Sequence, residues 1–149
     1  MAQALELQNY VGHLIRRAEQ VHTALWYRHV SREITSQQFA VLNALSRDPG
    51  IDQRTLARFT SLDRSTVNHI VRRLTDQHYV NQVRDEEDRR RTLLSLTVQG
   101  AELLDSLIGP AKNINEQLLD ALTYTERQQA IDILRKIASL DDESLHGGP

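Results

Sequence analysis

The chain has 149 residues, of which 40% are hydrophobic and 26% are charged, and its formal net charge is −2. This length predicts one domain, since domains average about 100–200 residues. The lack of cysteine excludes disulfides, thiolate metal ligands, a cysteine nucleophile and redox sensing through cysteine oxidation within this chain.

The charged residues are unevenly distributed along the sequence. Residues 47–91 contain 10 arginines and 8 acidic residues, so the other 8 of the 18 basic residues and the other 12 of the 20 acidic residues lie outside this segment. Such a difference alone does not indicate a function, because charged stretches are usually solvated surface. The net charge of −2 is therefore an average over a basic middle and acidic flanks.

Two helices are predicted in the first third of the chain. Apolar residues recur every three or four positions between residues 7 and 25, which predicts a long helix over residues 7–30. After a short turn, Thr35 is predicted to be the N-cap of a second helix over residues 36–47. Pro49 and Gly50 are expected to end this second helix.

The next segment has the pattern of a helix-turn-helix. Asp52 is predicted to cap a short helix over residues 53–59, and Asp63 is predicted to cap a helix over residues 64–77. Only residues 60–62 separate the two helices. Two short capped helices joined by so few residues favour a helix-turn-helix motif.

A β-hairpin is predicted directly behind the helix-turn-helix. Residues 80–84 and 92–96 are rich in aliphatic or β-branched side chains and predict two short strands. The seven residues between them, 85–91, are all charged. A strand, a charged loop and a strand in this position are typical of a wing.

Helices are predicted again after the wing. Thr97 is expected to cap a long helix that runs past a kink at Gly109-Pro110 toward Leu122. Thr125, with Gln128 three residues later, predicts a capping box that opens the last helix. The predicted fold class is mainly α with a small β-wing (α+β), a winged helix-turn-helix flanked by N- and C-terminal helices.

Two motifs of the wing identify a family. Residues 85–90 read DEEDRR, matching D-x-x-D-x-R, and residues 96–100 read LTVQG, matching L-T-x-x-G. With residues 35–42 and 62–67, these motifs resemble the MarR family of transcription regulators. The resemblance is close over residues 35–105 and extends to the flanking helices by pattern only.

The resemblance implies an organisation and a set of partners. Residues 1–149 form a single domain, with a DNA-binding lobe at 35–97 and dimerisation helices at 5–30 and 98–141. The expected partners are double-stranded DNA with a palindromic operator, a second copy of the chain in a homodimer, and a small aromatic carboxylate as effector. Helical stripes at both termini favour a dimer independently, because so small a wing domain cannot bury them all.

His78 departs from the family pattern, which usually has glycine after the recognition helix. The position requires a left-handed backbone, which histidine tolerates better than most residues. His69 replaces a common arginine and affects the expected reading of bases.

The start of the second helix of a helix-turn-helix enters the major groove, where arginine can bind guanine and asparagine can bind adenine. In the wing, consecutive arginines suit a narrow and strongly negative minor groove. The resemblance implies that Arg90 enters this groove and that Asp88 helps to position it. The alternatives are a solvated helix face and a charged hairpin tip that keeps an edge soluble. The predicted DNA-binding residues are Arg54, Arg64, Ser65, Thr66, Asn68, His69, Arg72, Arg73, Asp88, Arg89, Arg90 and Arg91.

A ligand site is predicted on the first helix from similarity to the subgroup that controls aromatic-acid catabolism. Arg16 would bind a carboxylate, His22 a phenolic hydroxyl, and Trp26 would stack on the ring. On a helical wheel, His22 and Trp26 lie at the edge of the apolar stripe, whereas Arg16 points away from it. Arg16 therefore reaches a pocket only if a second face of the helix is covered. The alternatives are a surface role for Arg16 and core positions for His22 and Trp26.

An enzymatic function is not expected. Ser65 and His69 lie four residues apart on one helix, but no third orienting group or nucleophile elbow accompanies them. The histidines lack metal-ligand spacing and no glycine-rich phosphate loop is present, so neither a metal nor a cofactor is predicted. The default expectation is a cytoplasmic protein without a membrane segment. The alternative function is an architectural winged-helix protein with no small-molecule effector.

Overall fold

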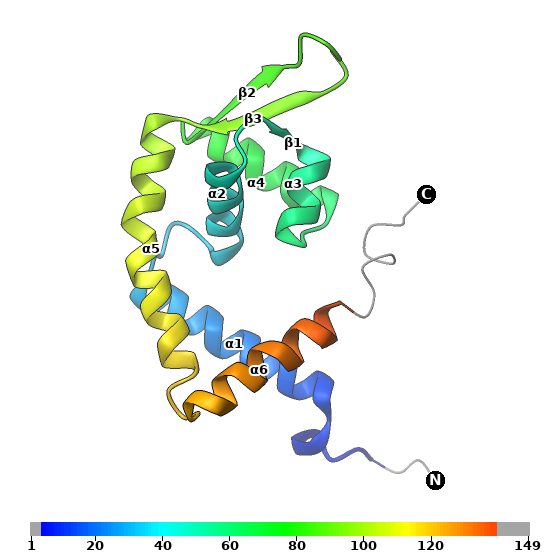
Figure 1. Ribbon diagram of the computed structural model, residues 1–149, viewed down its shortest axis with the longest axis vertical. Helices are drawn as coiled ribbons and strands as arrows, with labels where there is room; N and C mark the ends of the chain where they lie inside the picture. Colours follow the sequence, from blue (N-terminus) through cyan, green and yellow to red (C-terminus); the bar gives the residue numbers. More distant parts are fainter. Residues whose placement is uncertain (1–3, 140–149) are drawn as a thin grey trace.

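The computed structural model describes residues 4–139, which contain six α-helices, one short 3-10 helix and three strands (Figure 1). This arrangement confirms the predicted fold class. In chain order the elements are η1 (Leu7–Asn9), α1 (Val11–His29), α2 (Ser36–Arg47), β1 (Ile51–Asp52), α3 (Gln53–Thr60), α4 (Arg64–Asp76), β2 (Val80–Arg84), β3 (Thr92–Leu96), α5 (Val98–Leu118) and α6 (Tyr124–Ala138).

The lobe formed by α2, α3, α4 and the sheet lies at one end of the molecule, and α1 and α6 lie at the other end, with α5 connecting them (Figure 1). The sheet is antiparallel with strand order β1-β3-β2. Strands β2 and β3 pair from Val80 opposite Leu96 to Arg84 opposite Thr92, as expected for a wing. The strand β1 was not predicted, because two residues carry no readable alternation; Ile51 pairs with Leu94.

One hydrophobic core holds the lobe together. Its three helices and β3 contribute aliphatic side chains that are almost completely buried: Leu42 and Leu45 from α2, Leu56 from α3, Leu74 from α4 and Leu94 from β3. Residues of α5 join the same core, so this helix is fixed to the lobe. A displacement of α5 is thereby transmitted to the helix-turn-helix through packed side chains.

The predicted N-caps of the lobe are confirmed. The N–H of Gln38 donates to Thr35 Oγ1 at 3.1 Å, and the Thr35 N–H donates to Gln38 Oε1 at 2.9 Å, completing a capping box. Asp63 accepts from the Thr66 N–H at 2.8 Å, and Thr97 accepts from the Gly100 N–H at 2.9 Å. These bonds pair N–H groups that a helix leaves without an internal partner.

The turn after α4 and the start of α5 approach each other closely. His78 has φ of 63°, which confirms the left-handed backbone expected at this position. The Thr97 hydroxyl donates to the His78 carbonyl at 2.7 Å, and the Thr97 N–H donates to the Tyr79 carbonyl at 3.1 Å. A Cβ on Gly100 would lie only 2.1 Å from the Tyr79 carbonyl oxygen, so the glycine of the L-T-x-x-G motif is required by contact between two backbones.

The start of the last helix differs from the prediction. The capping box consists of Thr123 and Glu126, not Thr125 and Gln128, and α6 begins at Tyr124. Both pairs have the same spacing, but the charged Glu126 accepts from both the N–H and the hydroxyl of Thr123, each at 2.8 Å. Hydrogen bonds to a carboxylate are stronger than those to a neutral amide, which explains why the earlier pair is the cap.

The predicted ends of two other helices were also wrong. The first α-helix begins at Val11 instead of residue 7, because Tyr10 is extended and separates it from η1. Helix α5 runs through Pro110 and changes direction near its middle in Figure 1, but it ends at Leu118 before reaching Leu122. Residues 140 and 141 of the predicted dimerisation segment lie outside the described residues.

Arg127 connects α6 to the end of α5. Its guanidinium donates to Glu116 at 2.8 Å and to the Leu122 carbonyl at 3.1 Å, and it lies 3.9 Å from Asp120. The sequence did not reveal this contact, because its partners precede Arg127 by 5 to 11 residues across a turn. The arginine fixes the direction in which α6 leaves α5.

Candidate DNA-binding surface and ligand pocket

Helix α4 has one buried and one exposed face. Its buried face consists of Val67, Ile70, Val71 and Leu74. The predicted DNA-binding residues Arg64, Ser65, Asn68, His69, Arg72 and Arg73 are all exposed. Thr66 is only partly exposed, and its hydroxyl donates to Asp63 at 2.7 Å. The exposed residues remain predicted DNA contacts, whereas Thr66 already serves the helix cap.

A hollow separates the first turns of α3 and α4 on this face. It is lined by Arg54 and Gln53 from α3, and by Arg64, Ser65, Val67 and Asn68 from α4. Two arginines at two helix N-termini favour an anion such as a DNA phosphate. Gln53 was not among the predicted residues, because an isolated glutamine at the start of a helix has no distinctive pattern.

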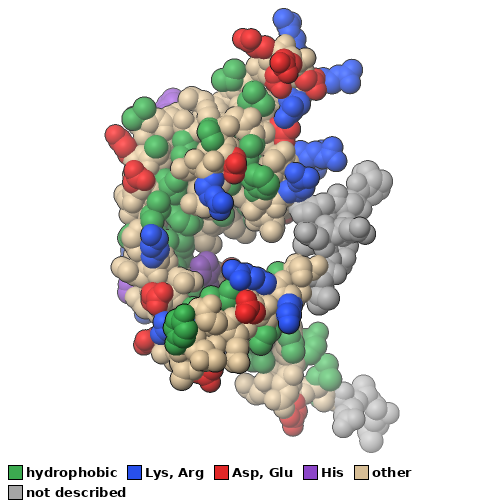
Figure 2. Space-filling view, viewed as in Figure 1, with side chains coloured by type: hydrophobic (Ala, Val, Ile, Leu, Met, Phe, Trp, Pro, Cys, Tyr) green, Lys and Arg blue, Asp and Glu red, His purple; other side chains and the backbone are tan. Residues whose placement is uncertain are grey.

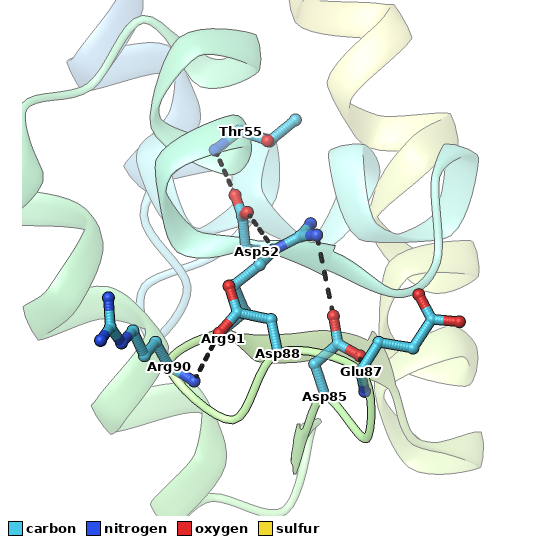
Figure 3. A network of polar contacts seen from close by, with 7 residues as sticks. All are labelled: Asp52, Thr55, Asp85, Glu87, Asp88, Arg90 and Arg91. Carbon is cyan, nitrogen blue, oxygen red and sulfur yellow. Dashed lines mark hydrogen bonds and ion pairs between the residues drawn. The ribbon is translucent and has the colours of Figure 1, made fainter.

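The wing tip is held in shape by its own backbone and acidic side chains (Figure 3). Asp85 accepts from the Glu87 N–H and Asp88 accepts from the Arg90 N–H, each at 3.0 Å. Arg84 donates to the Arg89 carbonyl at 2.8 Å. The bond from Arg90 to Asp88 is consistent with the positioning role expected of Asp88.

Arg91 connects the wing to the helix-turn-helix. Its guanidinium lies between two carboxylates, with Nε 3.1 Å from Asp52 Oδ2 and Nη1 3.7 Å from Asp85 Oδ2. The side chain of Arg90 points away from this network (Figure 3). Neither Arg89 nor Arg90 forms a side-chain ion pair within residues 4–139. Arg89 and Arg90 therefore remain predicted DNA contacts, while Arg91, also a predicted contact, is already engaged with acidic partners.

Asp52 has two structural roles. Its Oδ1 accepts from the Thr55 N–H at 2.8 Å and caps α3, while its Oδ2 binds Arg91. The hydrogen bond from the Thr55 N–H lowers the pKa of Asp52 below its ordinary value of 3.8; Arg91 lowers it further, and partial burial opposes the change. The charged carboxylate is thus favoured in the folded state.

We expect Asp52→Asn to lower the free energy of unfolding at pH 7 by about 0–1 kcal/mol, since asparagine keeps a cap but loses the ion pair. Asp52→Ala should cost about 1 kcal/mol more, because the cap is lost. The lowered pKa stabilises the fold above the unfolded-state value, and this contribution disappears as the pH falls through the folded-state pKa. Urea unfolding from pH 7 to pH 3 at equal protein concentration should show the wild-type advantage over Asp52→Asn shrinking. A constant difference would contradict the role of the charge.

Arginine side chains gather along the edge of the lobe that runs from the wing toward α3 (Figure 2). Acidic side chains mix with them at the wing tip. Because the acidic groups Asp85 and Asp88 bond within the tip, they shape the loop that presents the arginines. The edge offers a cationic surface to a polyanion.

A pocket of about 380 Å³ lies between the lobe and the helices that connect it to the other end of the molecule. Helix α1 contributes Glu19, His22 and Trp26, and α5 contributes Asn115 among others. The remaining lining residues are Ser36, Gln37, Phe39, Ala40, Thr60, Leu62, Ala111, Ile114 and Leu118. The pocket thus has apolar walls and a few polar groups, which suits a small organic ligand.

The structure brings together two of the three predicted ligand residues. His22 and Trp26 line the pocket with ring centroids 6.2 Å apart, whereas Arg16 is exposed and does not line it. Trp26 is also a structural residue: it is 5% exposed, its indole N–H donates to the Ile34 carbonyl at 2.6 Å, and it packs on Phe39. Sequence reasoning missed Glu19, because an exposed acid on a helix has no distinctive pattern.

Helices at the end of the molecule away from the lobe leave large apolar side chains uncovered. None of the residues of α6 is buried, and Leu134 and Ile137 on it are 58% and 40% exposed. From η1 to the second turn of α1 the uncovered apolar residues include Leu7, Tyr10, Val11, Leu14 and Ile15. Uncovered apolar helix faces of this kind favour a protein–protein interface.

Within residues 4–139, no helix combines the length and apolar character needed to cross a bilayer. No group of three or more potential ligands is positioned there to hold a metal ion.

Comparison with known proteins places this arrangement among transcription regulators. The sequence profile of the MarR family matches residues 33–91. The HTH-type transcriptional repressor NicR of Pseudomonas putida is 35% identical over 140 residues, which cover 93% of this chain and 89% of NicR.

Two solved structures share the fold over nearly their whole length. The PcaV transcriptional regulator from Streptomyces coelicolor, in complex with its natural ligand, superposes with a TM-score of 0.90 at 40% identity, covering 93% of this chain and 99% of PcaV. BpsR of Bordetella bronchiseptica, whose DNA binding is regulated by 6-hydroxynicotinic acid, superposes with a TM-score of 0.81 at 31% identity, covering 87% and 98% of the two chains.

Proposed function

Because this chain belongs to the MarR family of transcription regulators, we propose that it is a homodimeric repressor that releases a palindromic operator when a small aromatic carboxylate binds. One observation carries the proposal: the pocket lies where α1 and α5 meet the lobe that presents α4 and the wing. A ligand held there contacts both the DNA-binding lobe and the helices that would form the dimer.

The exposed side chains of α4 and the wing support a division of labour on DNA. Arg64 is suited to guanine and Asn68 to adenine in the major groove, because each side chain can bind the base edge with two hydrogen bonds. Arg90 is suited to the minor groove and Arg54 to a phosphate. In a symmetric dimer the two recognition helices would lie about 34–36 Å apart, one turn of the double helix, and would read a palindrome.

The uncovered apolar faces of α1 and α6 support the dimer. A helix that buries none of its own residues in the chain gains stability when a second copy covers it. Residues 5–30 and the described part of 98–141 are the proposed interface. The Arg127 contacts orient α6 for this purpose.

The pocket chemistry supports an aromatic carboxylate with a polar ring substituent. His22 and Glu19 can bind a ring hydroxyl or ring N–H, and Phe39 with Trp26 supplies aromatic surface. No lysine or arginine lines the pocket of the described chain, so the partner for a carboxylate must come from elsewhere. We assign this role to Arg16, which would bind the carboxylate once a second subunit covers the exposed side of α1.

Release follows from differential affinity for two arrangements of the dimer. A ligand that bridges α1, α2 and α5 favours the spacing between lobe and dimer helices that fits the ligand best. In the ligand-bound arrangement, the distance between the two recognition helices would differ from one turn of DNA. The ligand and the operator would then weaken each other's binding by the same factor.

The test is a thermal-shift screen of benzoates, hydroxycinnamates and pyridine carboxylates, followed by operator binding. A ligand at about one hundred times its Kd should stabilise the protein by about 2.7 kcal/mol and weaken binding to an operator selected from random DNA. His22→Ala and Arg16→Ala should reduce both effects, whereas Arg17→Ala, a neighbouring change of the same kind, should retain them in full. If no compound shifts the melting temperature or weakens DNA binding, the protein is instead an architectural winged-helix protein without an effector.

A cytoplasmic location, the absence of enzymatic activity and the absence of a cofactor remain predictions. The MarR family consists of transcription regulators, which agrees with the expected absence of enzymatic activity.

A further inference from the structure

A second hollow lies between α2 and the C-terminal turn of α3, beside the pocket that His22 and Trp26 line, which we call the effector pocket. Its volume is about 470 Å³. Helix α2 and its C-cap contribute Phe39, Ala40, Arg47 and Asp48 among others, and α3 contributes Phe59 and Thr60. Unlike the effector pocket, this hollow has its own cation.

Phe59 is unusual for a residue of the helix-turn-helix. Its side chain is 55% exposed and does not belong to the core cluster of the lobe, although the neighbouring Leu56 is fully buried. Leaving the apolar surface of a phenyl ring in water costs about 25 cal/mol of free energy for each Å². A ring that is not needed for packing is available to a planar ligand.

Arg47 supplies the charge at the same place. It is exposed, and its guanidinium forms no ion pair or side-chain hydrogen bond within residues 4–139. The adjacent Asp48 accepts no side-chain hydrogen bond within that range either, so it is available for a ring hydroxyl. A planar guanidinium binds a carboxylate with two parallel hydrogen bonds.

The nearby helix carbonyls compete little for the arginine. The Thr60 hydroxyl donates to the Leu56 carbonyl at 2.8 Å, and the Asp48 N–H donates to the Ala44 carbonyl at 3.0 Å. Each of these two carbonyls therefore already accepts a hydrogen bond. The hollow therefore combines an aromatic wall, an unpaired guanidinium and a hydroxyl acceptor.

From these groups we infer that the hollow is a second binding site for an aromatic carboxylate, with the ring against Phe59 and the carboxylate on Arg47. The ligand class rests on the proposed function, whereas the location rests on the groups that line the hollow. Phe39, Ala40 and Thr60 line both this site and the effector pocket, so the two sites share a wall. A ligand here presses on α3, which packs directly on α4.

The chain provides a direct readout, because it contains only two phenylalanines. Phe59 lines only the second hollow, while Phe39 lines both. The full-length protein would be labelled with 4-fluorophenylalanine and titrated with 4-hydroxybenzoate while the two ¹⁹F signals are followed; Phe59→Leu assigns them. The neutral 4-hydroxybenzamide serves as the matched control ligand.

We expect the Phe59 signal to move saturably with 4-hydroxybenzoate and little with the amide. Arg47→Gln should weaken this response about tenfold, the usual loss for a charge-assisted hydrogen bond, and Arg58→Gln should leave it unchanged. The His22→Ala variant should retain it, since His22 lines only the effector pocket.

Two results would overturn the second site. The first is a Phe59 signal that does not shift while the Phe39 signal does. The second is a Phe59 shift that persists in Arg47→Gln but disappears in His22→Ala, because such a shift would be transmitted from the effector pocket. Failure of the proposed effector pocket would be a separate result. In Arg47→Gln, the Phe39 signal would then no longer shift with 4-hydroxybenzoate at all.

Discussion

Leu134→Glu is expected to convert the protein to a monomer and to weaken operator binding by about 10²–10⁴-fold, the gain that linking two binding modules usually provides. Leu134 is 58% exposed on α6, between Ala130 and Ile137 on the same face. A charge at the centre of an apolar interface loses its water and finds no partner there. Sedimentation equilibrium would give the oligomeric state, and fluorescence anisotropy the affinity for the operator.

Gln128→Glu is the matched control on the same helix. It introduces the same charge about 120° around α6 from Leu134 and outside the face of Ala130, Leu134 and Ile137, so we expect no change in either measurement. Circular dichroism of Leu134→Glu should show an intact lobe, because the buried core lies in α2 to α5 and the sheet. A dimeric Leu134→Glu variant that binds the operator normally would contradict the proposed interface.

Arg90→Ala is expected to weaken binding to many DNA sequences alike. The arginine is presented by a loop that its neighbour Asp88 holds in shape, and it forms no ion pair within the described residues. Each lost phosphate-type contact lowers the slope of log K against log salt by about one unit, so a dimer should lose about two. Binding measured between 50 mM and 300 mM salt, on operator and on unrelated DNA, gives this slope.

Asn68→Ala supplies the contrast that separates positioning from base reading. A bidentate contact to adenine is worth about 1–3 kcal/mol of discrimination, so this variant should accept other bases at one position of each half-site. Its salt slope should stay close to that of the wild type. If both variants bind the operator as the wild type does, the surface formed by α4 and the wing is not the DNA-binding surface.

Features that depend on neighbours in the sequence were predicted well. The caps at Thr35, Asp52, Asp63 and Thr97 are all present, since each needs only a side chain and an N–H three residues later. The bounds of both wing strands agree with the prediction. The last capping box was wrong because two overlapping pairs had the same spacing, and only the strength of the acceptor distinguished them.

Features that depend on distant parts of the chain were not predictable in this way. The helical wheel of α1 could place Arg16 away from its apolar stripe, but only the packing of α2 and α5 on α1 showed that a pocket forms at His22 and Trp26. Glu19 and Gln53 became candidates for the same reason. Their residue types are common on helix surfaces, and their surroundings alone make them distinctive.

The sequence by itself therefore determined the order of the elements, their caps and the arginine-rich wing, because these follow from local hydrogen bonding and from the periodicity of apolar residues. Only the tertiary structure decided what each arginine does. Arg91 binds Asp52, 39 positions away, while Arg90 stays exposed and Arg47 faces a hollow. These outcomes depend on the through-space arrangement of charges and cavities, which packing of the core creates and which the spacing of residues along the chain does not contain.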